Sequence, residues 1–394
     1  MWRWDIFCSV VDNYGDIGTC WRLAQQLAGE YEADVRLWVD HLESFSRLCP
    51  DILTTAALQK KGPIEIRHWQ SDFPIVDVAD VVIEAFACEL PEAYIAAMAR
   101  RAVVPVWINL EYLSAETWVE ECHLLMSPHP TLPLTKTFFF PGFTNKTGGL
   151  LRERDLLGNR AAFDSAAAVE FWDTVGTPAV AAGSGLNDVG TIERTDAELR
   201  VSLFCYDNPA LPDLLQCWAD GPAAVRILAT PGAATEQIAR WFGKALSPGM
   251  PLQREALTVQ LLPFLSQADY DRLLWACDVN FVRGEDSFVR AQWAQKPFVW
   301  QIYPQAENVH LIKLDAFLTR YLSGFQNADI VRRCWQAWNG TGDIGAAWRD
   351  YVENRLPIQQ HGKVWASHLD RAGNLANNLV CFVRGISTGK MGNV

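Results

Sequence analysis

A strand-to-helix junction between residues 278 and 294 constrains this chain more than any other segment. Residues 278–282 are apolar enough to form a short buried strand, and Gly284 gives the backbone after it extra freedom. Ser287 can then cap a helix that runs through Ala294. The segment therefore predicts a parallel strand that leads directly into a helix.

The charges at this junction indicate what it binds. Free N–H groups at the start of a helix attract an anion, and Arg283 and Arg290 add positive charge. Glu285 and Asp286 do not suit a phosphate cradle, but they suit the hydroxyls of a sugar or a neighbouring arginine. Together these residues predict a nucleotide-sugar site.

A second junction of the same kind lies at the N-terminus, where an apolar segment 4–11 is followed by a polar loop and a helix. A dinucleotide fold would place G-x-G-x-x-G at this turn, but only Gly15 and Gly18 are present. Asp12 and Asp16 would repel phosphate, yet they can hold a cation or accept a proton. We expect this loop to serve an acceptor substrate; the alternative is that both acids only shape the loop through Asx turns and caps.

Strands and helices alternate along the rest of the chain. In the first half we expect strands at 4–11, 34–39, 64–68, 81–84, 104–109 and 123–127. In the second half we expect strands at 198–206, 225–229 and 257–262 and helices at 209–219, 233–243 and 268–276. This alternation is typical of α/β sheets and predicts two Rossmann-like domains that face one another. Residues 181–185 are small enough for a linker or loop between them, and residues 364–382 have helical periodicity.

Composition agrees with this organisation. A chain of 394 residues has room for two substantial cores, and 49% hydrophobic residues with 17 Trp exclude a disordered chain. No apolar run reaches the roughly 18 residues of a membrane span, and the start does not resemble a signal peptide, so we expect a soluble cytoplasmic protein. The net charge of −12 argues against direct binding of nucleic acid.

The cysteines and the acidic motifs give no sign of a metal. The ten Cys occur singly, without C-x-x-C, and residues such as Cys8, Cys277 and Cys381 fall in apolar patterns, so we expect reduced core thiols. Asp269 and Asp271 have the D-x-D form that binds a metal–diphosphate in some glycosyltransferases. Because an apolar helical pattern follows them, we interpret them as the opening of a helix.

The two junctions together carry a resemblance to a known family. The segments VVDNYGDIGTCWRLAQQLA and FVRGEDSFVRAQWA, with LLPF, DYDRLLW and PFVWQIYPQ, resemble the protein-arginine rhamnosyltransferases that modify elongation factor P in some bacteria. The resemblance implies a GT-B glycosyltransferase that uses TDP-β-L-rhamnose, without a metal or cofactor. It also implies an acceptor domain at 1–184, a nucleotide-sugar domain at 185–363, and a C-terminal helix at 364–386 that crosses back to the first domain.

The resemblance also implies roles for the acids. Asp16 would be the general base and Asp12 its partner, holding a guanidinium that is a poor nucleophile until a carboxylate orients it. Residue chemistry alone does not decide which of the two takes the proton. Glu285 is a further catalytic candidate, or it fixes the donor sugar or the diphosphate loop.

Donor contacts are expected from both junctions and from the strand ends between them. Phe204 and Tyr206 alternate on one face of a strand and could stack on thymine; their alternative role is ordinary core. The remaining expected contacts are Gly15, Gln260, Arg283, Gly284, Asp286, Ser287 and Tyr303. On the acceptor side, residues 109–114 follow a strand and could line the site.

The resulting hypothesis is an inverting transfer of rhamnose to an arginine of elongation factor P, in a cleft between two domains that close on binding. Two alternatives stay open. A nucleotide-sugar epimerase of the same architecture would need no protein acceptor, and a non-catalytic protein could simply sense a nucleotide sugar.

Overall fold

The computed structural model describes residues 2–12, 14–70, 73, 77–176 and 198–387 of the chain. These residues divide into two compact units. Unit 1 comprises residues 1–154, 315–320 and 367–394, and unit 2 comprises residues 155–314 and 321–366. The boundary expected at 184/185 and the expected linker at 181–185 lie outside the described residues.

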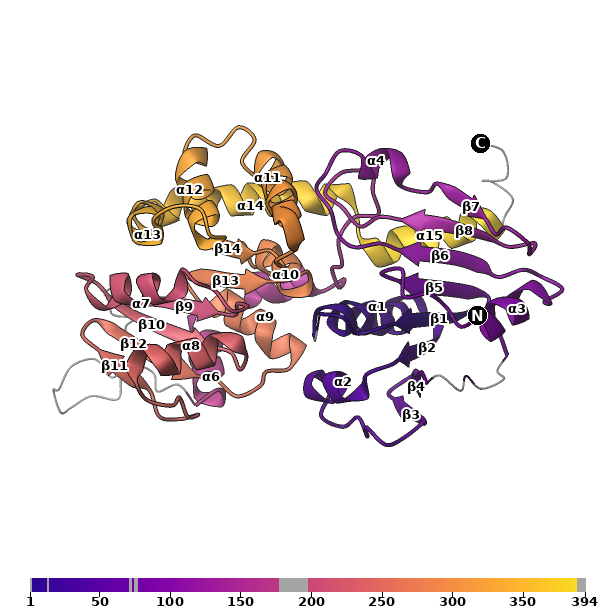
Figure 1. Ribbon diagram of the computed structural model, residues 1–394, viewed down its shortest axis with the longest axis horizontal. Coiled ribbons are helices and arrows are strands. Elements are labelled where there is room, and N and C mark those ends of the chain that lie inside the picture. The colour runs from indigo at the N-terminus through magenta and orange to yellow at the C-terminus, as the bar shows by residue number, and fades with distance from the viewer. Residues whose placement is uncertain (1, 13, 71–72, 74–76, 177–197, 388–394) are drawn as a thin grey trace. The chain divides into compact units, whose positions relative to one another are not determined.

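Unit 1 is built on an eight-stranded sheet with the order β3-β4-β2-β1-β5-β6-β8-β7 (Figure 1). Its strands are β1 Arg3–Cys8, β2 Asp34–Val39, β3 Leu58–Lys61, β4 Ile64–His68, β5 Val81–Ala85, β6 Val106–Leu110, β7 Met126–Pro128 and β8 Thr135–Phe139. Its helices are α1 Gly15–Tyr31, α2 Leu42–Leu48, α3 Glu92–Ala99, α4 Val119–Cys122 and α15 Leu375–Ser387. Among the described strands of unit 1, only the edge strands β3 and β7 pair antiparallel with their neighbours.

Unit 2 contains a six-stranded sheet with the order β11-β12-β10-β9-β13-β14. Its strands are β9 Glu198–Leu203, β10 Ala224–Ala229, β11 Leu252–Arg254, β12 Leu257–Leu261, β13 Val279–Arg283 and β14 Phe298–Gln301. Its helices are α5 Leu156–Ala162, α6 Ser165–Thr174, α7 Leu211–Ala219, α8 Ala233–Phe242, α9 Gln267–Ala276, α10 Asp286–Ala294, the 3₁₀ turn η1 Ala306–Asn308, α12 Ala328–Trp338 and α13 Ile344–Glu353. Two further helices, α11 Val309–Tyr321 and α14 Arg355–Ala372, contain residues of both units.

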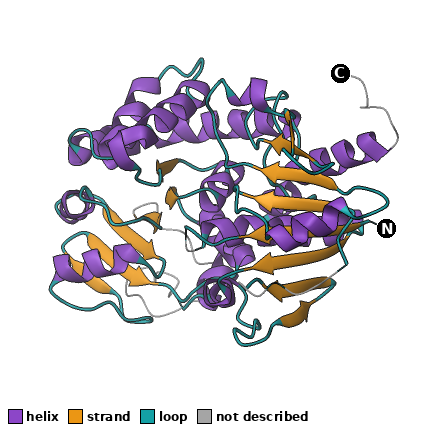
Figure 2. Cartoon of the chain, turned by 45° about the vertical axis from the view of Figure 1, so that its right-hand side comes forward, coloured by secondary structure: helices purple, strands orange, loops and turns teal. Residues whose placement is uncertain are grey.

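The unit 1 sheet is covered by helices on both faces (Figures 1 and 2). Successive side chains of a strand point to opposite faces, and β1 follows this rule. Ile6 packs in the cluster formed with α1, α2 and α15, whereas Phe7 packs with Tyr94 and Met98 of α3. A sheet buried on both faces explains why its parallel strands are almost continuously apolar.

The parallel strands of each unit follow the doubly wound order. In unit 1 they run β4-β2-β1-β5-β6-β8, so the order reverses between β1 and β5. In unit 2 they run β12-β10-β9-β13-β14, with the reversal between β9 and β13. In such sheets ligands bind outside the carboxyl ends of the strands at the reversal, which is called the switch point. Both junctions found in the sequence follow a strand that borders a switch point.

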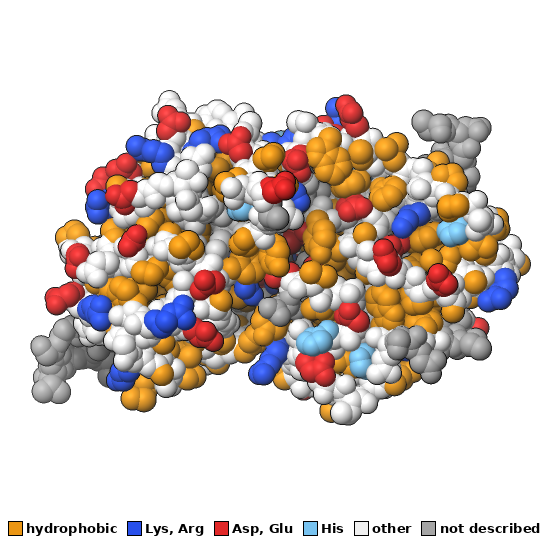
Figure 3. Space-filling model, in the orientation of Figure 1, with side chains coloured by type: hydrophobic (Ala, Val, Ile, Leu, Met, Phe, Trp, Pro, Cys, Tyr) orange, Lys and Arg blue, Asp and Glu red, His pale blue; other side chains and the backbone are white. Residues whose placement is uncertain are grey.

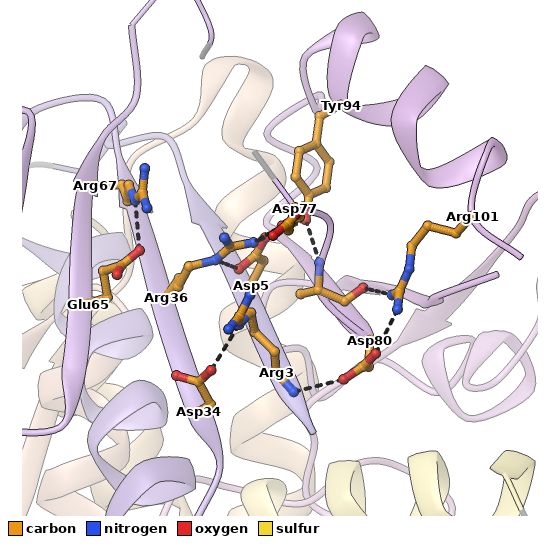
Figure 4. A network of polar contacts seen from close by, with 11 residues as sticks. Arg3, Asp5, Asp34, Arg36, Glu65, Arg67, Asp77, Asp80, Tyr94 and Arg101 are labelled. Atoms are coloured by element: carbon orange, nitrogen blue, oxygen red, sulfur yellow. Dashed lines mark hydrogen bonds and ion pairs between the residues drawn. The ribbon is translucent and has the colours of Figure 1, made fainter. Parts of the chain in front are cut away.

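At the opposite end of β1, a buried ion pair links β1 to β2 (Figure 4). Arg36 of β2 donates two hydrogen bonds to Asp5, with Nε 2.6 Å from Oδ1 and Nη2 2.5 Å from Oδ2. The Tyr94 hydroxyl also donates to Asp5, and Arg36 bonds the backbone oxygen of Asp77. Burial raises the pKa of the Asp5 carboxyl, and the ion pair with Arg36 opposes that shift. The hydrogen bonds of the Asp5 carboxylate to Arg36 and Tyr94 therefore give it a structural role.

The structure corrects three local expectations. The C-terminal helix is two helices, α14 and α15, because Gly373 between them adopts φ +106°. α15 nevertheless packs in the unit 1 core, as expected. Cys381 is exposed and not a core thiol, although Cys8 and Cys277 are buried. The expected strand at 123–127 is also displaced, since α4 ends just before His123 and β7 starts at Met126.

Candidate functional site

The first candidate region lies where the loop after β1 enters α1, beside the switch point of unit 1. Asp16 sits in the first turn of α1 and is 2% exposed. Its Oδ2 accepts hydrogen bonds from the backbone N–H groups of Val11 and Asp12, each at 2.8 Å. Its Oδ1 accepts one from the Tyr112 hydroxyl at 3.2 Å.

Burial raises the pKa of the Asp16 carboxyl, and the nearby Asp12 adds to the rise. The two backbone N–H groups and the Tyr112 hydroxyl oppose it. A carboxylate that is buried but kept ready to bind a proton is the usual state of a general base.

Gly15 allows the two acids to lie close together. A Cβ at this position would lie 2.8 Å from Oδ2 of Asp12, so a larger residue would displace that carboxylate. The Gly15 N–H also donates to the backbone oxygen of Asp12 at 2.6 Å. The loop therefore needs glycine at position 15 for close packing.

The segment 109–114 reaches the same region from the end of β6. Tyr112 connects it to Asp16 through the hydrogen bond given above. Asn109 is 1% exposed and donates from its amide nitrogen to Glu111. The structure thus brings this segment of the expected acceptor side to the acids.

The second candidate region lies at the switch point of unit 2, where β13 leads into α10. Gly284 adopts φ +59°, which is the left-handed region that glycine tolerates best. Glu285 occupies the N-cap position and Asp286 begins the helix. The predicted strand, turn and helix are confirmed, and the helix starts at Asp286, two residues after the glycine.

Ser287 does not cap this helix, so that expectation is wrong. It lies inside α10, where its hydroxyl accepts a hydrogen bond from the Arg283 N–H at 3.0 Å and donates one to the Arg283 backbone oxygen. Because the glycine turn is so tight, the serine faces back onto the strand end. Its role here is to fix the junction.

Arg290 is also placed differently from the expectation. It is 2% exposed and donates two hydrogen bonds to Asp271, with Nε 2.8 Å from Oδ1 and Nη2 2.6 Å from Oδ2. Its charge is therefore neutralised inside unit 2, and the expectation that it attracts a bound anion is wrong. The same pair explains the D-x-D motif: α9 begins with Ser266 as its N-cap, as predicted, and Asp271 is a structural residue.

Arg283 has a different environment from Arg290. Its guanidinium carbon lies 4.4 Å from the ring centre of Phe204 and 4.3 Å from that of Tyr206, and the residue is 8% exposed. Cation–π contacts of this kind hold a guanidinium without using its hydrogen-bond donors. The Tyr206 ring also meets the edge of Tyr303, which is 47% exposed, at 5.3 Å. Phe204, Tyr206, Arg283 and Tyr303 thus form one cluster at the carboxyl edge of the sheet.

Gln260 lies on β12, which β10 separates from β9 in the unit 2 sheet. It occupies the interior of β12, is 2% exposed, and donates from Nε2 to the backbone oxygen of Gly176 at 3.1 Å. In the connection that follows β12, Phe264 is 39% exposed and Gln267 is the first residue of α9.

Asp16 and Arg283 differ from the other buried charged residues in the described part of the chain, because those residues form ion pairs. Among the described residues, eight Asp, Glu and Arg side chains are buried: Asp5, Asp16, Arg22, Arg36, Glu84, Asp271, Arg283 and Arg290. Six of them take part in ion pairs, which are Asp5–Arg36, Arg22–Glu153, Glu84–Lys136 and Asp271–Arg290. In the part of the chain that the structure describes, Asp16 and Arg283 have no partner of opposite charge. A buried charge of this kind is costly unless a ligand completes it.

Within the described ranges, no group of three or more His, Cys, Asp or Glu side chains is arranged to hold a metal ion. No helix there has the length and apolar character needed to cross a membrane. On the face shown in Figure 3, acidic, basic and apolar side chains are mixed, so the coloured atoms of this face present no continuous patch of one charge.

Comparison with known proteins places both regions in a family. The model of the family "Elongation-Factor P (EF-P) rhamnosyltransferase EarP" matches residues 4–384. The protein-arginine rhamnosyltransferase of Pseudomonas putida is 48% identical over 97% of this chain and 98% of its own length. That of Neisseria meningitidis serogroup B is 38% identical over 91% and 89%.

Solved structures agree. A structure that describes EarP-mediated arginine glycosylation of translation elongation factor EF-P is 35% identical, with a TM-score of 0.68, and covers 98% of this chain and 99% of that one. The glycosyltransferase VinC in complex with dTDP has a TM-score of 0.50 at 12% identity over 98% of this chain and all of that one, which speaks for the fold alone. The fold is GT-B, and the chain belongs to the EarP family of EF-P rhamnosyltransferases.

Proposed function

We propose that this protein is a protein-arginine rhamnosyltransferase that moves rhamnose from TDP-β-L-rhamnose to an arginine side chain of elongation factor P, in the cytoplasm. Membership of the EarP family supports this, and the observation that carries it to particular residues is the distribution of buried charge. Asp16 is a buried anion and Arg283 a buried cation, and neither is paired among the described residues. The substrates carry the opposite charges, a guanidinium and a diphosphate.

The acceptor half of the proposal concerns unit 1. The guanidinium of the acceptor pairs with Asp16, and Asp12 holds it through further hydrogen bonds, which carboxylates form well with a planar guanidinium. As a guanidinium nitrogen forms its bond to the anomeric carbon, it loses a proton to Asp16. The segment 109–114 lines the same side, because Tyr112 already touches Asp16.

The donor half concerns unit 2. The bond between the anomeric carbon and the diphosphate oxygen breaks as the new bond forms, so negative charge develops on the departing TDP. Arg283 and the N–H groups at the start of α10, including those of Asp286 and Ser287, stabilise that charge. Gly284 lets the diphosphate approach the backbone, and Glu285 orients the sugar or the reacting groups.

Thymine recognition is assigned to the aromatic cluster. Phe204 and Tyr206 offer ring faces, and Tyr303 lies at the edge of Tyr206. Because Arg283 now lies against both rings, its guanidinium would leave part of that surface when the base stacks and the diphosphate binds. Gln260 is left out of the proposed set, since its amide bonds Gly176 inside the unit. Gly15 is assigned to packing around Asp12, with a donor contact as a secondary role.

The test is intact mass spectrometry of unmodified elongation factor P after incubation with this protein and TDP-rhamnose, with fragmentation to locate the adduct. We expect the mass of one deoxyhexose on an arginine. Controls are omission of the donor and replacement of TDP-rhamnose by TDP-glucose. An unchanged mass, in a sample where calorimetry shows that the donor binds, would refute the acceptor assignment.

The same samples distinguish the two alternatives. An epimerase would convert TDP-rhamnose to an isomer in the absence of elongation factor P, which chromatography of the nucleotide sugars would reveal. A sensor protein would bind the donor and leave both substrates unchanged.

A further inference from the structure

The turn after β5 is strained at several residues that are not glycine. Phe86 has φ +57°, Ala87 has φ +53° and Glu89 has φ +52°, all in the left-handed region. Such backbone conformations persist only where the surroundings hold them, and they concentrate at functional sites. This turn borders the switch point of unit 1, because β5 is the strand next to β1.

The strained turn holds the ring of Phe86 against Tyr112. The Phe86 N–H donates to the backbone oxygen of Leu110 at 2.7 Å, which fixes the turn to the end of β6. The two rings are stacked, with their centres 4.4 Å apart and an angle of 18° between their planes. Tyr112 itself is 42% exposed, and the stack places its ring against the strained turn.

Tyr112 in turn contacts the buried acid. Its hydroxyl donates to Oδ1 of Asp16 at 3.2 Å, whereas Oδ2 is already bound by two backbone N–H groups. Among the described residues, Tyr112 is the one side chain that donates a hydrogen bond to Asp16. The chain of contacts therefore runs from the strained turn, through Phe86 and Tyr112, to the carboxylate.

We propose that Tyr112 is a positioning residue that orients Oδ1 of Asp16 toward the acceptor, and that the left-handed turn at Phe86 holds the Tyr112 ring for this purpose. The inference rests on the proposed role of Asp16 as the base. It goes beyond that role by naming a side chain that controls the base and the backbone device that supports it.

The inference predicts a particular pH dependence. A hydroxyl that donates to a carboxylate favours its ionised form, so loss of this donor raises the pKa of Asp16 further. The other titratable groups that interact with Asp16 are Asp12 in the same loop and Cys8 at the end of β1. Cys8 in turn interacts with Cys20 of α1 and with Asp40, which follows β2. Both Asp12 and Cys8 remain in a Tyr112 variant, so a change in the profile is attributable to the missing hydroxyl.

The experiment is the pH profile of kcat/KM for transfer to elongation factor P by the wild type and by Tyr112→Phe. We expect kcat/KM to fall about 3- to 30-fold, and the acid limb of the profile to move to higher pH by about 0.5–1 unit, the size of one ordinary hydrogen bond. Phe86→Leu, which removes the stack and keeps an apolar side chain, should move the limb the same way by a smaller amount.

Control variants distinguish a failure of this inference from a failure of the proposed function on which it rests. Tyr31→Phe, at the far end of α1, should leave the profile unchanged, and circular dichroism should show that every variant is folded. If Asp16→Asn is inactive but Tyr112→Phe has the wild-type acid limb, the role of Tyr112 is refuted and the base assignment stands. If Asp16→Asn keeps near-normal turnover, both ideas fail together.

Discussion

The two switch points carry opposite buried charges, and this contrast tells more about function than either region alone. At the switch point of unit 1 the buried charge is the carboxylate of Asp16, held by backbone N–H groups and a tyrosine hydroxyl. At that of unit 2 it is the guanidinium of Arg283, held against two aromatic rings. Elsewhere in the described residues, buried charges are paired within the protein. The proposed function accounts for this difference, because its substrates carry the opposite charges.

The largest effect is expected at Asp16. Asp16→Asn keeps the shape and an oxygen that can accept from Val11 and Asp12, but it removes the proton acceptor. We expect turnover to fall by about 10²- to 10⁴-fold, the usual contribution of a general base. At about pH 4 the free energy of unfolding should change by no more than about 1 kcal/mol, since no partner charge is left exposed by the substitution. Rapid-quench transfer assays and urea titrations would measure the two quantities.

The paired charges should behave in the opposite way. Arg290→Met leaves Asp271 buried without its cation and should lower the free energy of unfolding by about 3–5 kcal/mol. The double variant Asp271→Leu with Arg290→Met should recover most of that loss, because neither charge remains. Denaturant titrations of the two variants give the comparison. Equal instability of both would show that the pair has a role beyond mutual neutralisation.

Substitution of Arg283 should impair function more than stability, as expected for Asp16 and in contrast to Arg290. Arg283→Met keeps an apolar side chain between Phe204 and Tyr206, so we expect stability within about 1 kcal/mol of the wild type. Donor affinity should fall by about 10- to 100-fold, which corresponds to the loss of charge-assisted hydrogen bonds to a diphosphate. Calorimetric titration with TDP measures it. Wild-type affinity for TDP in this variant would contradict the proposal that Arg283, like Asp16, binds a substrate of opposite charge.

The smallest effect is a pH dependence of stability. Burial raises the pKa of Asp16 above its unfolded value of about 3.9, so protonation stabilises the folded state. This contribution is fully present below the unfolded pKa and is lost as the pH rises through the folded pKa. The stability of the wild type relative to Asp16→Asn should therefore decline from about pH 4 upward, by about 1.4 kcal/mol for each unit of pKa shift. Urea titrations of both proteins across that range would detect a flat or rising difference, either of which contradicts the sign.

How far the sequence could predict this site is clearest from the two arginines of one segment. Arg283 and Arg290 lie seven residues apart, and local pattern treated both as positive charge for an anion. The structure pairs Arg290 with Asp271 and places Arg283 between aromatic rings. The partner that neutralises a buried charge comes from another helix or strand. A local sequence pattern does not show which distant side chain that is. The same reason accounts for Gln260 and for the contact of Tyr112 with Asp16.

The sequence by itself determined the alternation of strands and helices, both junctions, the helical character of the C-terminal segment, and the resemblance to a glycosyltransferase family. These depend on local periodicity, turn residues and motifs, which are written in consecutive residues. The tertiary structure alone decided the strand order, the break at Gly373 and the strained turn at Phe86. It also decided which buried charges are paired, because pairing depends on contacts between residues far apart in the chain.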